Sequence, residues 1–188
     1  MNEPLTRERI VESAIGCFVR FGVRKSAMAD VAQTAGVSRQ TVYDLFGNKD
    51  ELIRASIRAI TAESLANIER RWALCVGLAD RLDVYFEETV LKSYELLQSA
   101  HDPEDLISGH NEAGASAIAE SHAKHAALMA QSLAAYSTAL SEHNLNPDQF
   151  AHYIVSVAMG FKYVKDRDEL NQLLASLRAS VLMTVGAH

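Results

Sequence analysis

Apolar residues recur every three or four positions along most of this 188-residue chain, which is the spacing of one face of an α-helix. The first run begins near Thr6, whose hydroxyl can cap a helix, and stops at Gly22. Two shorter runs follow, one stopping at Gly36 and the other starting after Ser38 and stopping at Gly47. The expected helices of this first part cover about residues 6–21, 26–35 and 38–46.

Longer runs of the same kind occupy the rest of the chain. Gly109 and Gly114 weaken the pattern over residues 104–121, where one or two short helices are expected, because glycine is a poor helix former. Asn146 can cap a helix that has Pro147 at its first position. With few Pro, few Gly and no strand-like runs, the predicted fold is all-α. The further expected helices cover about residues 49–74, 79–100, 122–143, 147–164 and 168–185.

The stretch Gly36–Lys49 has the layout of the second half of a helix-turn-helix. A glycine sets the turn, Ser38 caps a helix of about seven or eight residues, and Gly47-Asn48 ends that helix. A helix of this length fits the major groove of DNA, where side chains near its N-terminus reach base edges. Arg39 can bind guanine and Gln40 can bind adenine, each through two hydrogen bonds.

Residues 6–52 resemble the DNA-binding domain of the TetR/AcrR family of transcriptional repressors. The resemblance implies an N-terminal three-helix helix-turn-helix domain over residues 1–48, followed by a helical ligand-binding and dimerisation domain over residues 49–188. The residues that match fall in the family's order and spacing without a gap. They are Ile10, Ala14, Phe18, Gly22, Val31, Ala32, Ala35, Gly36, Val37, Ser38, Thr41, Tyr43, Phe46, Lys49 and Leu52.

The predicted DNA contacts combine base-reading and phosphate-binding side chains. Thr41 can touch a phosphate or a thymine methyl, and the Tyr43 hydroxyl can bind a phosphate. Lys49 adds positive charge where a helix N-terminus already favours an anion. Simpler readings stay open: Ser38 as a cap alone, Tyr43 as a structural brace, and the two base-reading side chains as solvated surface. The predicted set is Ser26, Ser38, Arg39, Gln40, Thr41, Tyr43 and Lys49.

Two positions in this part depart from the family pattern. Asp44 often has a neutral or basic counterpart, and an acidic group is repelled by phosphate. We therefore expect Asp44 to accept from a cytosine amino group, or to pair with Arg39 or a neighbouring Lys. Ala27 replaces a hydroxyl residue that is common at the start of the second helix, which removes one phosphate donor. Neither change breaks the fold, but both affect the affinity and the operator sequence.

The resemblance also implies a ligand cavity among the middle helices, whose occupancy shifts the spacing of two DNA-binding domains. The side chains there suggest an apolar or aromatic effector with one or two polar groups. For any single position, ordinary core packing is the favoured reading, because aromatic and Met stripes at helical spacing usually just pack. The candidate lining residues are Trp72, Tyr85, Phe86, Val90, Tyr94, His110, Met129, Leu133 and Tyr136.

A single helix-turn-helix reads too few base pairs to be specific, so a homodimer on a palindromic operator is expected. The last two predicted helices are long, apolar on one side and joined by a short turn. The family pairs these helices with those of a second copy in a four-helix bundle, although packing within one chain must use part of the same face. The predicted interface residues are Phe150, Ile154, Val157, Phe161, Leu170, Leu173, Leu174, Leu177 and Val181.

Charge is distributed unevenly along the chain. Residues 1–50 carry seven Lys or Arg against six Asp or Glu, a net of +1, and the remaining eleven against eighteen give −7. This asymmetry favours DNA binding at the N-terminal end. Cys17 and Cys75 both lie in apolar helical patterns and are interpreted as reduced core thiols. Because no signal peptide or membrane span is predicted, we expect a cytoplasmic protein with no membrane partner.

Enzymatic motifs are missing from the sequence, which contains no glycine-rich phosphate loop, nucleophile elbow or HExxH, so neither catalysis nor a cofactor is expected. His122 and His125 have a spacing that can share a cation with Glu120 or His110, but zinc-site spacing is absent, so no metal is predicted. The expected function is that of a ligand-responsive transcriptional repressor. The alternative is a helical adaptor that does not bind DNA sequence-specifically.

Overall fold

The computed structural model describes residues 3–108 and 112–187, which form helices and turns without any strand. The all-α prediction is therefore confirmed. Contacts divide the chain into two units, each with its own apolar core. One unit, here called the head, comprises Met1–Ala62 and Glu95–Ser121; the other, called the body, comprises Glu63–Tyr94 and His122–His188. The functional division that the sequence suggests at residue 48 stays a prediction.

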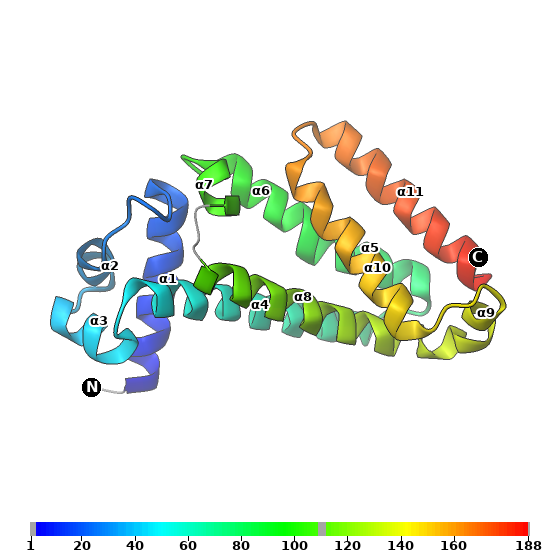
Figure 1. Ribbon diagram of the computed structural model, residues 1–188, viewed down its shortest axis with the longest axis horizontal. Helices are drawn as coiled ribbons and strands as arrows, with labels where there is room; N and C mark the ends of the chain where they lie inside the picture. Colours follow the sequence, from blue (N-terminus) through cyan, green and yellow to red (C-terminus); the bar gives the residue numbers. More distant parts are fainter. Residues whose placement is uncertain (1–2, 109–111, 188) are drawn as a thin grey trace. The chain divides into compact units, whose positions relative to one another are not determined.

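The first four helices of the head share one apolar core. Gly22 and Gly36 end the first two helices in the left-handed region, with φ of 86° and 63°, as the sequence predicts. One predicted cap is wrong, because the first helix already begins at Glu3 and Thr6 is buried inside it. These helices, blue to cyan in Figure 1, are α1 (Glu3–Phe21), α2 (Met28–Ala35), α3 (Arg39–Phe46) and the first half of α4 (Lys49–Trp72).

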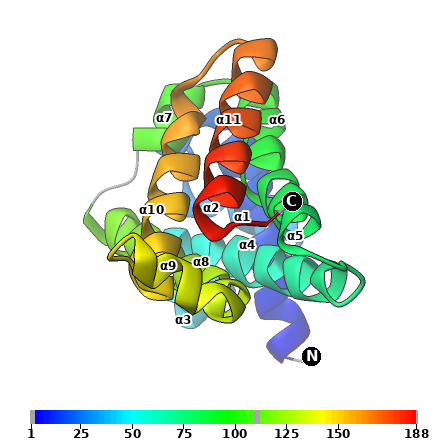
Figure 2. The same ribbon diagram turned by 90° about the vertical axis from the view of Figure 1, so that its right-hand side faces the viewer.

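A second segment of the chain completes the head. It contains the end of α6 (Lys92–Ser99), α7 (Pro103–Ser108) and the start of α8 (Glu112–Leu133). The ambiguous stretch 104–121 thus contains one short helix and the beginning of a long one. In Figures 1 and 2, α8 lies beside α4. There the Thr61 hydroxyl donates to Ser121 over 2.8 Å, which ties the two helices together within the head.

After the second half of α4, the body continues with α5 (Leu78–Phe86), which runs through the π-helix η1 (Glu87–Leu91) into α6. The sequence predicts one uninterrupted α-helix here, whereas the structure has the π-helical turn η1 within it. The helix predicted over about residues 122–143 is likewise interrupted, by a 3₁₀ turn at Ala134–Tyr136 before α9 (Ser137–Glu142). The periodic apolar pattern of the sequence continues through both interruptions, so that pattern does not reveal them.

Two long helices close the body, α10 (Pro147–Gly160) and α11 (Arg167–Val185). They run side by side, orange and red in Figures 1 and 2. The predicted start of α10 is confirmed: the Asn146 side chain accepts from the Gln149 amide over 2.9 Å, and Pro147 holds the first helical position. Apolar faces of α5, α8, α10 and α11 meet in the body core.

Candidate DNA-binding interface

Helix α3 is set by local sequence features that the structure confirms. Gly36 turns the chain, and the Val37 amide donates back to the Ala32 carbonyl over 3.0 Å. The Ser38 hydroxyl then caps α3 by accepting from the Thr41 amide over 3.0 Å. The Ser38 and Thr41 hydroxyls also lie 2.9 Å apart, so each is a hydrogen-bond partner of the other.

The outer face of α3 carries the predicted readers. Val42 and Phe46 are buried against α1 and α2, which turns Arg39, Gln40 and Tyr43 toward solvent. Because successive turns of a helix share a face, these three side chains form one exposed surface at the N-terminal half of α3. That placement is the one a helix inserted into a major groove requires.

Asp44 has a partner that the sequence analysis did not consider. Its carboxylate accepts from the Gln40 side-chain amide over 2.7 Å, one turn away on the same face. The expected pairing with Arg39 or a lysine is not what the structure shows. An amide group has two N–H donors and one carbonyl acceptor, so Gln40 keeps one donor and the acceptor for a base edge while Asp44 fixes its orientation.

Arg7 of α1 contacts the C-terminal end of α3, a role that the sequence analysis missed. Its guanidinium donates to the Leu45 carbonyl over 2.8 Å and lies 4.3 Å from the centre of the Phe46 ring. A cation at the C-terminal end of a helix interacts favourably with the free carbonyls there. No sequence signal marks this contact, because it joins residues 38 positions apart.

Ser26 contradicts two expectations. Ala27 is the N-terminal cap residue of α2, and its amide donates to the Asp30 carboxylate over 2.8 Å. Ser26 is only 2 % exposed, and its hydroxyl donates to the carbonyls of Cys17 and Gly22. The predicted start of this helix at about residue 26 is therefore wrong, because α2 begins at Met28. The buried Ser26 hydroxyl faces protein carbonyls instead of solvent, where a phosphate would lie.

Lys49 lies at the first position of α4, where Asn48 caps the helix by accepting from the Glu51 amide over 2.9 Å. The Lys49 ammonium donates to the Arg24 carbonyl over 3.1 Å, which holds it against the loop between α1 and α2. Partial burial lowers the pKa of Lys49, against the opposing effect of nearby carboxylates.

The same loop is fixed by a buried carboxylate on α7. Asp105 is 2 % exposed, accepts from the Arg24 amide over 3.0 Å, and forms an ion pair with the Arg24 guanidinium. Burial alone would raise the pKa of Asp105, but the hydrogen bonds and charge of Arg24 outweigh burial and hold that pKa below its ordinary value. The loop passes so close that a Cβ at Gly22 would lie 2.6 Å from the Asp105 carboxylate. Asp105 therefore positions the loop that in turn contacts Lys49.

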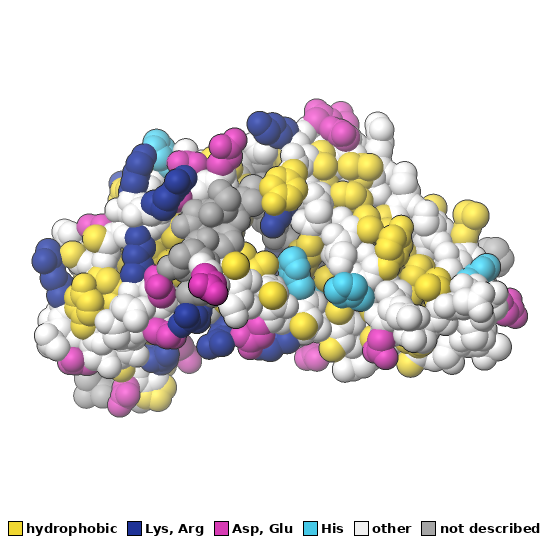
Figure 3. Space-filling view, viewed as in Figure 1, with side chains coloured by type: hydrophobic (Ala, Val, Ile, Leu, Met, Phe, Trp, Pro, Cys, Tyr) yellow, Lys and Arg dark blue, Asp and Glu magenta, His cyan; other side chains and the backbone are white. Residues whose placement is uncertain are grey.

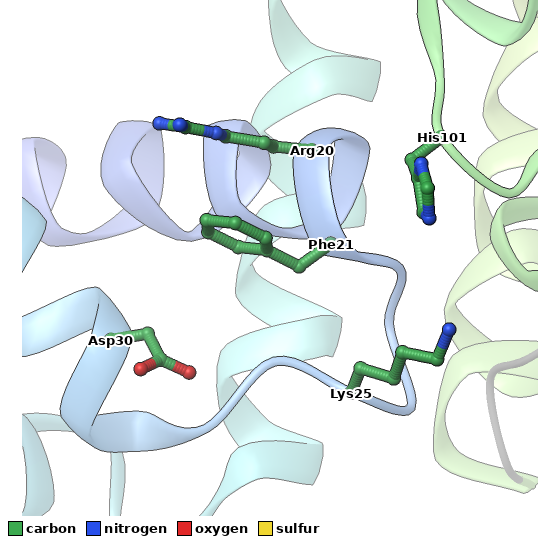
Figure 4. A pocket seen from close by; sticks show the side chains of 5 residues that line it. All are labelled: Arg20, Phe21, Lys25, Asp30 and His101. Atoms are coloured by element: carbon green, nitrogen blue, oxygen red, sulfur yellow. The ribbon is translucent and has the colours of Figure 1, made fainter.

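Beside this loop is an open hollow of about 620 Å³, shown in Figure 4. Arg20 and Phe21 reach it from the end of α1, Lys25 from the loop, Asp30 from α2, and His101 from the segment before α7. The Arg20 guanidinium lies 5.1 Å from the centre of the Phe21 ring. None of the seven predicted DNA contacts lines the hollow, but its basic residues add to the Lys and Arg side chains that gather over the helix-turn-helix elements in Figure 3.

Known sequences resemble the chain most strongly in the head. The family profile described as bacterial regulatory proteins, tetR family, matches residues 10–56. The regulator TtgR of Pseudomonas putida is 40% identical over 55 residues, which cover 29% of this chain and 26% of TtgR. A protein of Escherichia coli named as the probable acrEF/envCD operon repressor is 32% identical over 100 residues, 46% of each chain. Residues 10–56 thus match the DNA-binding part of TetR-family regulators.

The fold of TetR-family proteins extends over the whole chain. A crystal structure of a Rhodococcus sp. protein assigned to the family superposes with a TM-score of 0.75, covering 98% of this chain and all of the other, at 19% identity. The matched segments of the curated relatives are shorter, about a quarter of TtgR and about half of the Escherichia coli protein. Sequence similarity thus supports the head, and structural similarity supports the fold of head and body alike.

Most residues predicted to line a ligand cavity lie in the core of the body. Tyr94 and Tyr136 are partly buried at its edge, and His110 lies outside the described residues. The Tyr94 hydroxyl donates to the Lys165 carbonyl over 2.9 Å, which links α6 to the turn before α11. The fully or nearly buried members of the set are Trp72, Tyr85, Phe86, Val90, Met129 and Leu133.

The predicted dimer residues are mostly occupied within one chain. Six of the nine are buried in the body core, and Val157, Phe161 and Leu173 are partly exposed. The apolar stripe that the sequence shows is therefore chiefly the inner face of α10 and α11, which is the alternative that the sequence left open. The six buried residues are Phe150, Ile154, Leu170, Leu174, Leu177 and Val181.

No three His, Cys, Asp or Glu side chains within residues 3–108 and 112–187 gather closely enough to hold a metal ion. Across the same ranges, no helix combines the length and the apolar content needed to cross a membrane. His122 and His125, one turn apart on α8, both have a pKa lowered chiefly by burial.

Proposed function

We propose that this TetR-family chain is a DNA-binding transcriptional regulator that reads a palindromic operator as a homodimer and is released by a small effector. The observation that carries the proposal is the exposed face of α3, where Arg39 and Gln40 stand free of the core that holds the helix. Repression is the mode we propose, since one relative is named as an operon repressor.

Arg39 and Gln40 would provide the base contacts. Arginine binds guanine O6 and N7 together, and a glutamine amide binds adenine N6 and N7. Asp44 orients the Gln40 amide in the free protein, so the side chain loses less freedom on binding. Ser38, Thr41, Tyr43 and Lys49 would contact phosphates, which fix the register of the protein without reading sequence.

The surface proposed for dimerisation is the outward face of α10 and α11. Its exposed side chains carry no acidic or basic group between Asn171 and Thr184 other than Arg178, which is paired with Asp83. Tyr153 on α10 and Met183 on α11 are exposed apolar side chains there, Met183 to 81%. An uncharged surface with apolar anchors is typical of the buried centre of a protein interface.

A charge on this outward face tests the dimer. We expect Met183→Asp to convert the dimer into a monomer in sedimentation equilibrium and to reduce operator affinity at least tenfold. Leu74→Asp, at an equally exposed apolar position in the turn after α4, is the matched control and should change neither property. A Met183→Asp variant that stays dimeric would remove this face from the proposal.

DNA binding is tested by comparing two substitutions over a range of salt concentrations. Arg39→Ala should reduce the preference for the selected site over scrambled DNA about tenfold or more, because one bidentate base contact discriminates by about 1–3 kcal/mol. Lys49→Ala should weaken binding to both DNAs about equally and make the salt dependence less steep. Arg70→Ala removes the same charge from an exposed position of the body and serves as control. If the protein is instead an adaptor, it should show no preference for the selected site over scrambled DNA, and none of the three substitutions should change that.

A further inference from the structure

Three polar atoms in the body are buried without a hydrogen-bond partner. They are the Tyr85 hydroxyl, Nδ1 of His125 and Nε of Arg81. Tyr85 is 0% exposed and His125 is 3% exposed, so solvent does not reach either side chain. Buried polar groups in native proteins nearly always have partners, and each one left without a partner destabilises the fold. Three such atoms in one unit therefore call for an explanation.

All three atoms lie where α5 packs against α8. Arg81 and Tyr85 are four residues apart on α5 and so share one face of that helix. The Arg81 guanidinium contacts the Ser132 hydroxyl of α8 over 3.4 Å, and the Tyr85 and His125 rings meet edge to face at 5.8 Å. These two contacts place the three unpartnered atoms along a single helix–helix seam, on side chains that point from both helices into the core.

The charges at this seam are not balanced within the chain. Burial lowers the pKa of His125 to about 4. Burial also raises the pKa of Tyr85 above its ordinary value, against a smaller opposing effect of the nearby Thr89 hydroxyl, which donates to the Tyr85 carbonyl over 2.6 Å. Both side chains are therefore neutral at physiological pH. Arg81 carries a positive charge, and no carboxylate in the described parts of the chain forms an ion pair with it. A half-buried cation with neutral donors beside it favours a negatively charged ligand.

The side chains around the seam include types that repack readily. Met129 lies one turn after His125 on α8, and an unbranched Met side chain repacks more easily than a branched one. The π-helix η1 begins two residues after Tyr85, and π-turns of this kind occur frequently at functional sites. Apolar neighbours in the same core, among them Leu133 and Trp72, would face the uncharged part of the ligand.

We propose that the seam between α5 and α8 binds the effector, and that the effector is a small aromatic carboxylate. The carboxylate would bridge the Arg81 Nε–H and the Tyr85 O–H, two donors on one face of α5. His125 would pair with a further polar substituent, and the aromatic ring would lie among the apolar side chains of the core. The ligand's identity as an effector rests on the regulatory function proposed above, whereas the site itself does not.

The free protein gives a first test that needs no ligand. Tyr85→Phe removes a hydroxyl without a partner, so the melting temperature should be equal to or higher than that of the wild type. Tyr94→Phe is the matched control: its hydroxyl donates to the Lys165 carbonyl, and its removal should lower the melting temperature. If Tyr85→Phe lowers the melting temperature as much as Tyr94→Phe does, the Tyr85 hydroxyl has a partner in the fold and the proposal is wrong.

Binding is then measured with benzoate, 4-ethylbenzoate and 4-butylbenzoate, each beside its uncharged benzamide, by calorimetry and thermal shift. At least one benzoate should bind and raise the melting temperature with concentration. Arg81→Gln should weaken benzoate binding about tenfold or more and leave benzamide binding unchanged, while Tyr85→Phe should weaken both. No benzoate binding up to millimolar concentration, or equal loss of both ligand types in Arg81→Gln, would overturn the proposal.

A DNA-release assay with the same benzoates separates this inference from the proposed function. Release of operator DNA by a bound benzoate, lost in Arg81→Gln, supports both. A benzoate that binds the body of a protein with no affinity for DNA supports the site and contradicts the regulator. If the protein binds operator DNA, but no benzoate binds to the protein or releases the DNA, the result contradicts the site alone.

Discussion

One buried carboxylate of the head and three buried polar atoms of the body are opposite cases. In the head, the buried Asp105 carboxylate has an amide and a guanidinium as partners, both from Arg24. In the body, Tyr85, His125 and Arg81 each bury a polar atom that has none. A satisfied network fixes one geometry, as Asp105 does for the loop that contacts Lys49, whereas unsatisfied groups leave the body less stable than its packing allows.

The two regions should also respond to acid over different ranges of pH. The folded pKa of His125 lies below the ordinary value of about 6.5, so unfolding takes up a proton and the body loses stability as pH falls from 6.5 to 4. The folded pKa of Asp105 is also lowered, but from an ordinary value near 4. The stabilisation by Asp105 is therefore complete above about pH 5 and is lost only as pH falls through its folded value.

The largest expected effect is the acid response of the body. Protonation of the unfolded chain at His125 should reduce the free energy of unfolding by about 3 kcal/mol between pH 7 and pH 4. His125→Leu should remove most of this pH dependence, while His143→Gln, at an exposed position, should retain it. Urea unfolding at several pH values measures the free energy of unfolding of each variant. If that free energy depends on pH equally in His125→Leu and in the wild type, the burial of this imidazole is contradicted.

Next in size is the close approach of the loop to α7. Gly22→Ala should cost about 2–3 kcal/mol, because the residue has φ of 86° and the added Cβ would displace the Asp105 carboxylate. In an Asp105→Ala background only the backbone strain of about 1 kcal/mol should remain. Equal costs in the two backgrounds, measured as a double-mutant cycle of unfolding, would mean that the glycine and the carboxylate do not interact.

Asp105→Asn tests the satisfied carboxylate itself. Loss of the negative charge beside Arg24 should cost about 2 kcal/mol at pH 7, and the difference from wild type should vanish below the folded pKa of Asp105. Glu12→Gln removes an exposed carboxylate of α1 and is the control in the same unfolding experiment. The account of the head fails if the two variants are equally stable.

The smallest effect concerns Asp44. Asp44→Asn removes a negative charge from the α3 surface, so affinity for scrambled DNA should rise a few-fold because repulsion from phosphate is lost. Discrimination in favour of the selected site should fall by about 1 kcal/mol, because the Gln40 amide is no longer oriented by a carboxylate. Competition binding with both DNAs measures the two quantities, and an unchanged ratio would show that Asp44 does not orient Gln40.

Local signals in the sequence account well for the head. The glycine at Gly36 and the cap at Ser38 act within a few residues, and both are confirmed. The contacts of Arg7 with Leu45 and of Asp105 with Arg24 could not be predicted, because they join positions 38 and 81 residues apart. Likewise, Thr6 and Ser26 are of residue types that often cap helices, but tertiary packing buries both.

The body shows the limit of periodicity as a guide. Apolar spacing correctly predicts that α10 and α11 each have an apolar face, but it does not say what covers that face. Residues such as Ile154 and Leu170 turn out to pack within the chain, so the proposed dimer surface is formed by the less apolar outward face. The unpartnered atoms at Arg81, Tyr85 and His125 depend on side-chain geometry alone, which no pattern of residue types encodes.

The central claim is that the exposed face of α3 reads DNA as part of a dimer. Selection of bound fragments from a random double-stranded DNA library by the full chain tests this claim most directly. We predict recovery of one palindromic motif, with half-sites about one helical turn apart, and loss of a conserved guanine when Arg39→Ala is used instead. Recovery of no motif, or of the same motif with the same guanine from Arg39→Ala, would contradict the account.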